Sequence, residues 1–149
     1  MIDGVIYTPL SIIDVEGGNV LHAMKTSDAG FSGFGESYFS TIEPRTIKGW
    51  KLHREMVLNL VVPVGSVRFV IFDSRVDSKT EGKFSVYVLS RNNYGRLTVP
   101  PKLWVGFQGI DEQDSLLLNI ANIPHDPNEV EHKAQEEIVF DWSLINEEQ

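Results

Sequence analysis

Cysteine is absent from the 149 residues of this chain. Its absence excludes disulfides, thiolate metal sites and a cysteine nucleophile, and it is typical of proteins from a reducing compartment. Basic residues are also scarce, because 13 lysines and arginines stand against 21 aspartates and glutamates, giving a formal net charge of −8. A negative chain repels a phosphate backbone, so we do not expect nucleic acid as a partner.

Long hydrophobic runs are missing as well. No stretch approaches the roughly 20 apolar residues of a membrane helix, and the first residues lack the basic and apolar segments of a signal peptide. We therefore expect no membrane partner and a soluble, cytoplasmic protein. Because 42% of the residues are hydrophobic, the chain can build one core, and we expect residues 1–149 to form a single domain.

What the sequence does contain is period-two alternation and β-branched runs, separated by Gly, Pro and Asn. The predicted strands cover residues 6–14, 19–25, 34–42, 49–53, 58–62, 67–73, 84–90, 96–99, 103–109 and 115–121. Many short strands at this spacing predict an all-β sandwich or barrel. The acidic residues 128–137 are predicted to form a short helix.

Two protonatable side chains stand close together in the segment 47–53, before a long apolar run. Alternate residues of a strand point to the same face, so Lys51 and His53 share one face. The run that follows, residues 59–73, is interpreted as two strands bent between Pro63 and Gly65. These features place a basic pair at the mouth of a β-structure.

Several motifs together carry a resemblance to a known family. They are Lys48-Gly49 near a histidine, the strand pair through 65–73, the segments 84–90 and 94–101, Gly106-Phe107 and the late pair Asp126-Pro127. Over roughly residues 8–142 the chain resembles the dTDP-4-dehydrorhamnose 3,5-epimerase family, which are jelly-roll barrels of the cupin superfamily. The resemblance implies a single-domain cupin barrel and an epimerase or isomerase for a nucleotide-linked 4-keto-6-deoxysugar in surface polysaccharide biosynthesis. It also implies a homodimer in which an N-terminal segment such as 5–14 extends the sheet of the partner.

The chain departs from the family at several functional positions. Aligned without gaps, the position of the family's proton-abstracting histidine holds Lys51, whereas a shift of two residues puts His53 there. The family's catalytic tyrosine corresponds to Asn119, a second histidine to Val105, and a glutamine to Glu36, whose charge opposes a diphosphate. These losses favour an alternative function, a non-catalytic carbohydrate or nucleotide-sugar binding module.

The residues that remain are still able to support epimerisation next to a carbonyl, which needs a base, an acid and a cation near the enolate. Under the enzymatic hypothesis, Lys51 or His53 is the base and Tyr38 is the replacement acid. Lys48 and Arg45 hold an anionic group. The other candidate substrate-binding residues are Glu36, Trp104 and Asn119.

Each candidate also has a purely structural interpretation. Lys51 and His53 would lie on the solvent face of an edge strand, where lysine discourages strand addition. Trp104 would be a wall or core residue, and Arg45 would anchor a loop. Metal-binding cupins use two histidines one residue apart, but here the first is Lys51, so we expect neither a metal nor another cofactor.

Overall fold

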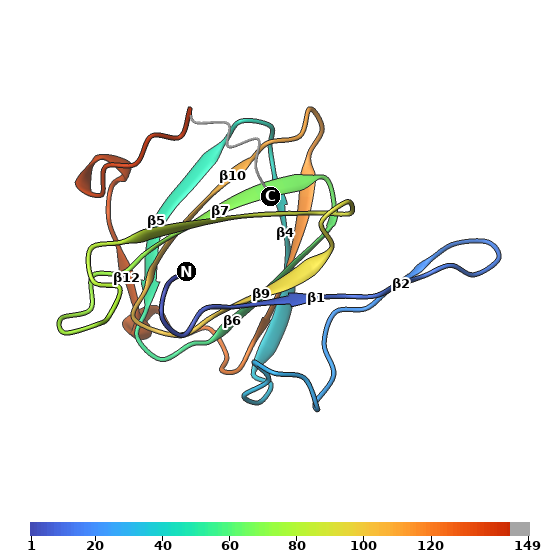
Figure 1. Cartoon of the computed structure of the whole chain (residues 1–149), viewed down its shortest axis with the longest axis horizontal. Coiled ribbons are helices and arrows are strands. Elements are labelled where there is room, and N and C mark those ends of the chain that lie inside the picture. Colours follow the sequence, from blue (N-terminus) through green and yellow to red (C-terminus); the bar gives the residue numbers. More distant parts are fainter. Residues whose placement is uncertain (144–149) are drawn as a thin grey trace.

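The computed structural model describes residues 1–143, and its strands form two five-stranded antiparallel sheets that enclose a barrel (Figure 1). The first sheet has the order β1 (Ile6–Pro9), β9 (Gly95–Val99), β6 (Leu58–Val64), β11 (Ser115–Ala121) and β4 (Glu36–Ile42). The second has the order β12 (Val130–His132), β5 (Ile47–His53), β10 (Trp104–Gly109), β7 (Ser66–Phe72) and β8 (Phe84–Ser90). This arrangement confirms the all-β prediction.

The chain repeatedly crosses from one sheet to the other, as in a jelly roll. One crossing joins β6 to β7 at Gly65, within the bend predicted from the sequence. Gly65 has a φ of +80°, and a Cβ at this position would lie 2.2 Å from Oγ of Ser115. Glycine is therefore required for this tight corner.

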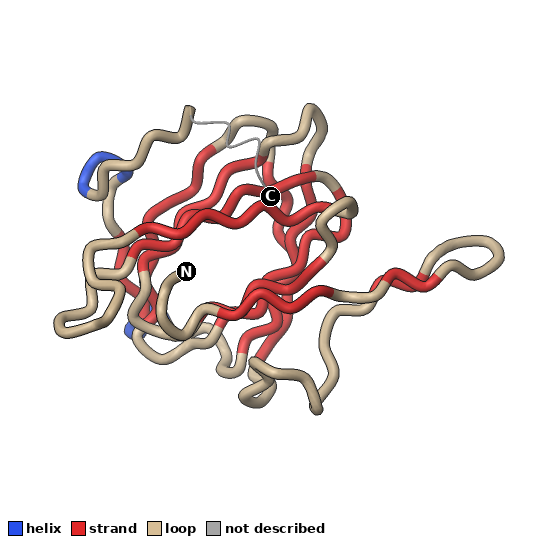
Figure 2. Tube along the Cα trace, in the orientation of Figure 1, coloured by secondary structure: helices blue, strands red, loops and turns tan. Residues whose placement is uncertain are grey.

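The two ends of the chain differ from the prediction. The predicted strand 6–14 is divided into β1 and the two-residue β2 (Ile12–Ile13), which pairs with β3 (Val20–Leu21) in a hairpin that projects from the barrel (Figure 2). The predicted helix 128–137 consists of two single-turn 3₁₀ helices, η1 (Pro127–Glu129) and η2 (Gln135–Glu137), with β12 between them. β12 forms because it pairs with the edge of β5, a long-range contact that local sequence does not reveal.

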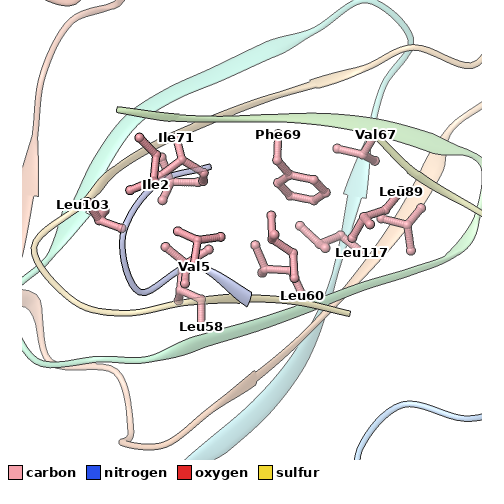
Figure 3. Packing of buried hydrophobic residues seen from close by; sticks show 14 of the residues in the cluster. Ile2, Val5, Leu58, Leu60, Val67, Phe69, Ile71, Leu89, Leu103 and Leu117 are labelled. Carbon is pink, nitrogen blue, oxygen red and sulfur yellow. The ribbon is translucent and has the colours of Figure 1, made fainter. Parts of the chain in front are cut away.

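The main core lies between the two sheets (Figure 3). Ile2 and Val5, from the N-terminal segment, lie inside the barrel opening beside Leu58, Ile71 and Leu103. Each fully buried aliphatic side chain contributes roughly 1.5–3 kcal/mol to stability. The N-terminal segment thus closes part of the barrel interior with apolar groups.

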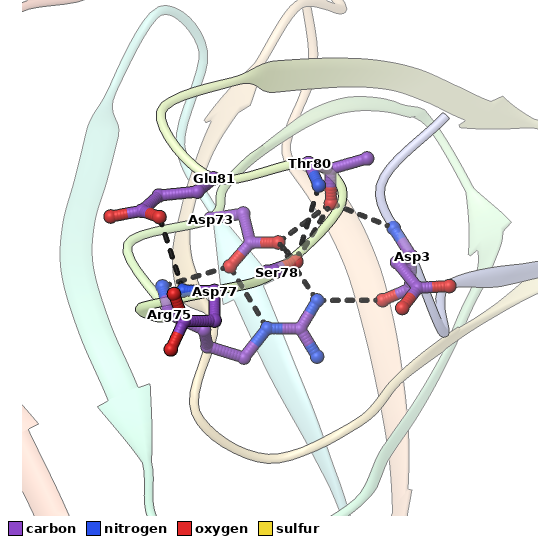
Figure 4. A network of polar contacts seen from close by, with 7 residues as sticks. All are labelled: Asp3, Asp73, Arg75, Asp77, Ser78, Thr80 and Glu81. Carbon is purple, nitrogen blue, oxygen red and sulfur yellow. Dashed lines mark hydrogen bonds and ion pairs between the residues drawn. The ribbon is translucent and has the colours of Figure 1, made fainter.

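A polar network fixes this N-terminal segment to the β7–β8 loop (Figure 4). The buried Asp73 carboxylate accepts hydrogen bonds from Arg75 at 2.8 Å, Ser78 at 2.7 Å and Thr80 at 2.6 Å. Arg75 also donates to the Asp3 carbonyl at 2.8 Å. The hydrogen bonds from Arg75 and its neighbours hold the pKa of Asp73 far below its usual range, so the network stays charged except in strong acid. No helix within residues 1–143 is both long and apolar enough to cross a membrane.

Candidate active site

Strand β5 presents two different faces. Lys51 and His53 point into a cavity of about 240 Å³ between the sheets, whereas Trp50 and Leu52 join an apolar cluster on the other side. β5 is also not an edge strand, because β12 and β10 flank it. The interpretation of Lys51 and His53 as solvent-facing residues of an edge strand is therefore wrong.

Five of the residues singled out from the sequence line this cavity together. They come from three strands: Tyr38 from β4, Lys48, Lys51 and His53 from β5, and Asn119 from β11. The other walls are mainly apolar and include side chains of β6, β10 and β11. The cavity thus combines an apolar lining with a few convergent polar groups, which is the usual composition of a small-molecule site.

His53 is held by a buried carboxylate that sequence reasoning missed. His53 and Glu129 are 6% and 4% exposed, and Nδ1 of His53 is hydrogen-bonded to Oε1 of Glu129. The second Glu129 oxygen accepts from the backbone N–H groups of Glu55 at 3.1 Å and Met56 at 3.2 Å. Glu129 is therefore fixed in place, and the imidazole is fixed with it.

The protonation states of this pair follow from burial and hydrogen bonding. Burial lowers the pKa of the His53 imidazole, and the neighbouring Glu129 only partly opposes this. Burial acts to raise the pKa of Glu129, but hydrogen bonds from His53, Glu55 and Met56 outweigh it and hold that pKa below its usual value. A neutral imidazole thus donates from Nδ1 to an ionised carboxylate, which leaves Nε2 as a free lone pair.

Tyr38 and Asn119 form a second polar pair in the cavity. They are direct partners across β4 and β11, and Nδ2 of Asn119 donates to the Tyr38 hydroxyl at 3.1 Å. Oδ1 of Asn119 accepts from the backbone N–H of Asn59 at 3.2 Å, which fixes the amide orientation. Because the Tyr38 oxygen accepts this bond, its own hydrogen is left to donate elsewhere.

Three further candidates lie outside this cavity. Arg45 is in the β4–β5 loop and lines a separate surface cavity with Asp111 and Glu112. Glu36 begins β4 and is not among the lining residues. Trp104 is 4% exposed on the opposite face of β10, where its Nε1 donates to Oγ of Ser74 at 3.2 Å. The structure does not bring these three side chains to His53.

Glu129 left only a weak signal in the sequence. It follows the pair Asp126-Pro127, where the Asp126 side chain accepts from the Asn128 N–H at 2.9 Å and starts the single turn η1. That turn was recognisable from the residue types. The inward direction of Glu129 was not, because it depends on β12 pairing with β5. Among residues 1–143, no three His, Asp or Glu side chains gather as metal ligands would.

Comparison with known proteins identifies the family. No protein-family model matches the chain. The chain is 38% identical to a dTDP sugar isomerase from Desulfovibrio desulfuricans G20, and the two structures have a TM-score of 0.91 over 95% of this chain and 92% of the other. The chain belongs to the dTDP-sugar isomerase family. The resemblance proposed from the sequence is thereby confirmed for the family.

Two curated relatives of the chain carry names that refer to glycan or polysaccharide biosynthesis. The chain is 31% identical over 106 residues to the probable low-salt glycan biosynthesis epimerase Agl13 of Haloferax volcanii, covering 70% of the chain and 66% of that relative. It is 25% identical over 147 residues to the spore coat polysaccharide biosynthesis protein SpsL of Bacillus subtilis, covering 96% and 97%. A dTDP-4-dehydrorhamnose 3,5-epimerase of Bacillus anthracis, crystallised with TDP and PPi, shares the fold at 19% identity and a TM-score of 0.81, over 93% of this chain and 85% of the other.

Proposed function

We propose that this protein is an epimerase or isomerase that acts on a nucleotide-linked 4-keto-6-deoxysugar in polysaccharide biosynthesis. The observation that carries the proposal is the His53–Glu129 pair, which aims a neutral imidazole into a cavity that also holds a phenol and two lysines. Family membership and the relatives named above support the same substrate class.

The proposed reaction begins at the carbon next to the keto group. Nε2 of His53 takes the proton, and the electron pair of the broken C–H bond moves to the keto oxygen as an enolate. The Lys51 ammonium stabilises that negative charge, and Glu129 stabilises the imidazolium. Tyr38 then returns a proton to the carbon as the enolate collapses to the ketone.

The assignment of His53 rather than Lys51 as the base depends on their surroundings. His53 has a carboxylate that fixes its tautomer, which is the arrangement of a general base. No described carboxylate forms an ion pair with Lys51. An ammonium without a counter-charge suits the enolate oxygen better than proton abstraction.

Tyr38 is the proposed replacement for the family's tyrosine. The gapless comparison made from the sequence sets that tyrosine at Asn119, and Asn119 donates a hydrogen bond to the Tyr38 hydroxyl. The phenol therefore lies one strand away from its expected position but still at the same cavity. The altered catalytic positions are, on this proposal, a relocation of the acid rather than the loss of catalysis.

Solvent deuterium exchange tests the proposed function against a binding module. The protein is incubated in D₂O with dTDP-4-keto-6-deoxyglucose, and the sugar is examined by NMR. We expect deuterium at a carbon adjacent to the keto group, because His53 exchanges its proton with solvent. Measurable binding without any incorporation would contradict the enzymatic proposal and leave a non-catalytic binding protein.

We also propose that the protein is a homodimer joined through the β2–β3 hairpin. This hairpin projects from the barrel (Figure 1). Its side chains Ile13, Val15 and Val20 are 45%, 50% and 48% exposed. Exposed apolar residues on a projecting arm favour burial against a second copy. Light scattering after size exclusion should give a dimer that Val20→Asp weakens, and a monomer at micromolar concentration would contradict the proposal.

A further inference from the structure

The hydrogen bond between Asn119 and Tyr38 has a direction, and that direction determines what the phenol can do. Nδ2 of Asn119 donates to the Tyr38 hydroxyl at 3.1 Å, and both residues line the His53 cavity. A hydroxyl carries one hydrogen, so a phenol oxygen that accepts here keeps its hydrogen for another partner. The opposite direction would commit that hydrogen to Asn119. The orientation of one buried amide therefore determines whether Tyr38 can donate to a ligand.

The backbone of β6 fixes the orientation of the Asn119 amide. The register of β6 against β11 extends to the pair of Leu60 and Asn119 and includes no partner for Asn59. The Asn59 N–H donates to Oδ1 of Asn119 at 3.2 Å. A backbone N–H can only donate, so the side-chain atom that faces it is the carbonyl oxygen. The amide nitrogen is thereby left for Tyr38.

Asn59 is itself held in place by two side-chain hydrogen bonds outside the cavity. Its Oδ1 accepts from Oγ1 of Thr98 at 2.6 Å, and its Nδ2 donates to the Gly30 carbonyl at 3.1 Å. Asn59, Thr98 and Asn119 are 2%, 4% and 2% exposed, so water hardly competes for these bonds. Buried polar groups that are fully paired specify one arrangement. The Asn59 N–H therefore stays directed at Asn119.

A second asparagine–tyrosine pair in the same protein has the reverse direction. Nδ2 of Asn93 donates to the Val88 carbonyl at 2.6 Å, which leaves Oδ1 to accept from the Tyr7 hydroxyl at 2.8 Å. The hydrogen of Tyr7 is committed to this contact. Because the two pairs consist of the same side chains, the backbone group that each asparagine meets sets the direction: a carbonyl at Asn93 and an N–H at Asn119.

We propose that Asn119 is a positioning residue that makes Tyr38 a hydrogen donor toward the cavity. The inference rests on the proposed function for the fate of that hydrogen. As the enolate collapses, its electron pair forms the new C–H bond with the Tyr38 proton, and the electrons of the broken O–H bond stay on the phenol oxygen. The Asn119 N–H then stabilises the phenolate until solvent reprotonates it. Asn119 thus acts on the reaction only through Tyr38.

Asn119→Asp reverses the hydrogen bond while it keeps the contact with Asn59. The carboxylate still accepts from the Asn59 N–H, but it also takes the Tyr38 hydrogen. We expect kcat to fall about 10²-fold, to the level of Tyr38→Phe, while deuterated substrate accumulates because His53 still removes the proton. Asn119→Leu removes the donor without adding a charge, and it should lower kcat about tenfold with KM within about twofold.

A double-mutant cycle shows whether Asn119 acts through Tyr38. In the Tyr38→Phe background, Asn119→Leu should change kcat less than about twofold further, because no hydroxyl is left to orient. A further tenfold loss would overturn the inference, since Asn119 would then act independently of the phenol. Asn92→Asp is the matched control for the added charge, because Asn92 is exposed and does not line the cavity. It should leave kcat unchanged, and thermal melting checks that every variant folds.

Ultraviolet resonance Raman spectroscopy reads the direction of the bond without turnover. The intensity ratio of the tyrosine doublet differs between a phenol that accepts a hydrogen bond and one that only donates. Because the chain has four tyrosines, the Tyr38 signal is the difference between spectra recorded with and without Tyr38→Phe. We expect an accepting phenol in the wild type and a purely donating one in Asn119→Asp.

The Raman result separates this inference from the proposed function. An unchanged doublet in Asn119→Asp would overturn the positioning role, even if the wild type exchanges deuterium into the sugar nucleotide normally. The expected change would uphold the orientation of the phenol toward the cavity, even if the wild type exchanges no deuterium and the catalytic proposal fails.

Discussion

The two faces of strand β5 have different surroundings: one lines a cavity and the other is packed in an apolar cluster. On the inner face, Lys51 and His53 line a cavity of about 240 Å³. On the outer face, Trp50 is 1% exposed, lies 5.6 Å from the Trp142 ring and donates from Nε1 to the Ile138 carbonyl at 3.1 Å. One face is packed by a C-terminal segment, and the other lines the candidate site.

The packed face explains how the open face keeps its geometry. Gly106 of β10 leaves room for the indole, since a Cβ there would lie 3.0 Å from the Trp50 ring and 3.1 Å from Trp142. Arg68 fixes the same C-terminal segment by donating to the Trp142 carbonyl at 2.8 Å. Catalytic or binding side chains keep a precise geometry when the strand that carries them is held rigid by packing on its other face. The outer face thus holds β5 in place by close packing, which the cavity side of the strand lacks.

The largest effect is expected on the inner face, from His53→Asn. The asparagine amide can still donate to Glu129, but it has no group equivalent to Nε2, so we expect kcat to fall by about 10²–10⁴. Deuterium incorporation should be lost in parallel, while thermal stability changes little. Incorporation at the wild-type rate would instead identify Lys51 as the base.

The opposite result is expected on the outer face, from Trp50→Ala. Removing this buried indole should lower the free energy of unfolding by about 3–5 kcal/mol, as for other large-to-small core substitutions. Urea denaturation measures this change, and kcat per folded molecule should stay within a few-fold. A hundredfold loss of kcat with normal stability would show that the two faces are not separate in function.

Tyr38→Phe separates proton removal from proton return. Without the hydroxyl, we expect kcat to fall about 10²-fold, while His53 still exchanges the substrate proton with solvent. NMR should therefore detect deuterated substrate with little product. Loss of exchange together with turnover would contradict the assignment of Tyr38 as the acid alone.

Glu129→Gln tests the buried carboxylate of η1 that is hydrogen-bonded to His53 of β5. Its loss should lower the free energy of unfolding by about 1–3 kcal/mol, because the amide cannot satisfy all the donors around it. It should also lower the His53 pKa further, since the negative charge that favours the imidazolium is gone. The acidic limb of kcat/KM should then move to lower pH, and a movement to higher pH would contradict the assigned pair.

The wild-type pH dependence of stability follows from the same two groups. The His53 pKa is depressed by burial, so its contribution to stability is complete above about pH 6.5 and is lost as the pH falls through the folded-state value. The Glu129 pKa is also depressed, so its contribution is lost at still lower pH, below the usual glutamate range. Both effects have the same sign, and stability should decrease on acidification.

Sequence alone predicts which side chains of β5 share a face, but it does not predict which of the two faces points into the cavity. Alternation places Lys51 and His53 on one face of β5 and Trp50 and Leu52 on the other, and the structure agrees. The same alternation does not tell which face is inside, because the outer face is also buried, under a segment about 85 residues later in the chain. Glu129 escaped prediction for the same reason, since its direction depends on the long-range pairing of β12 with β5.

The smallest effect is expected at the rim of the outer face, from Glu131→Gln. Glu131 lies across from Leu52, and its ion pair with Arg54 is largely solvent-exposed, with side chains 41% and 52% accessible. Such surface pairs contribute about 0–1 kcal/mol, so urea denaturation should show a shift within that range. A loss well above that range would contradict the assignment of Glu131 to an exposed surface pair at this rim.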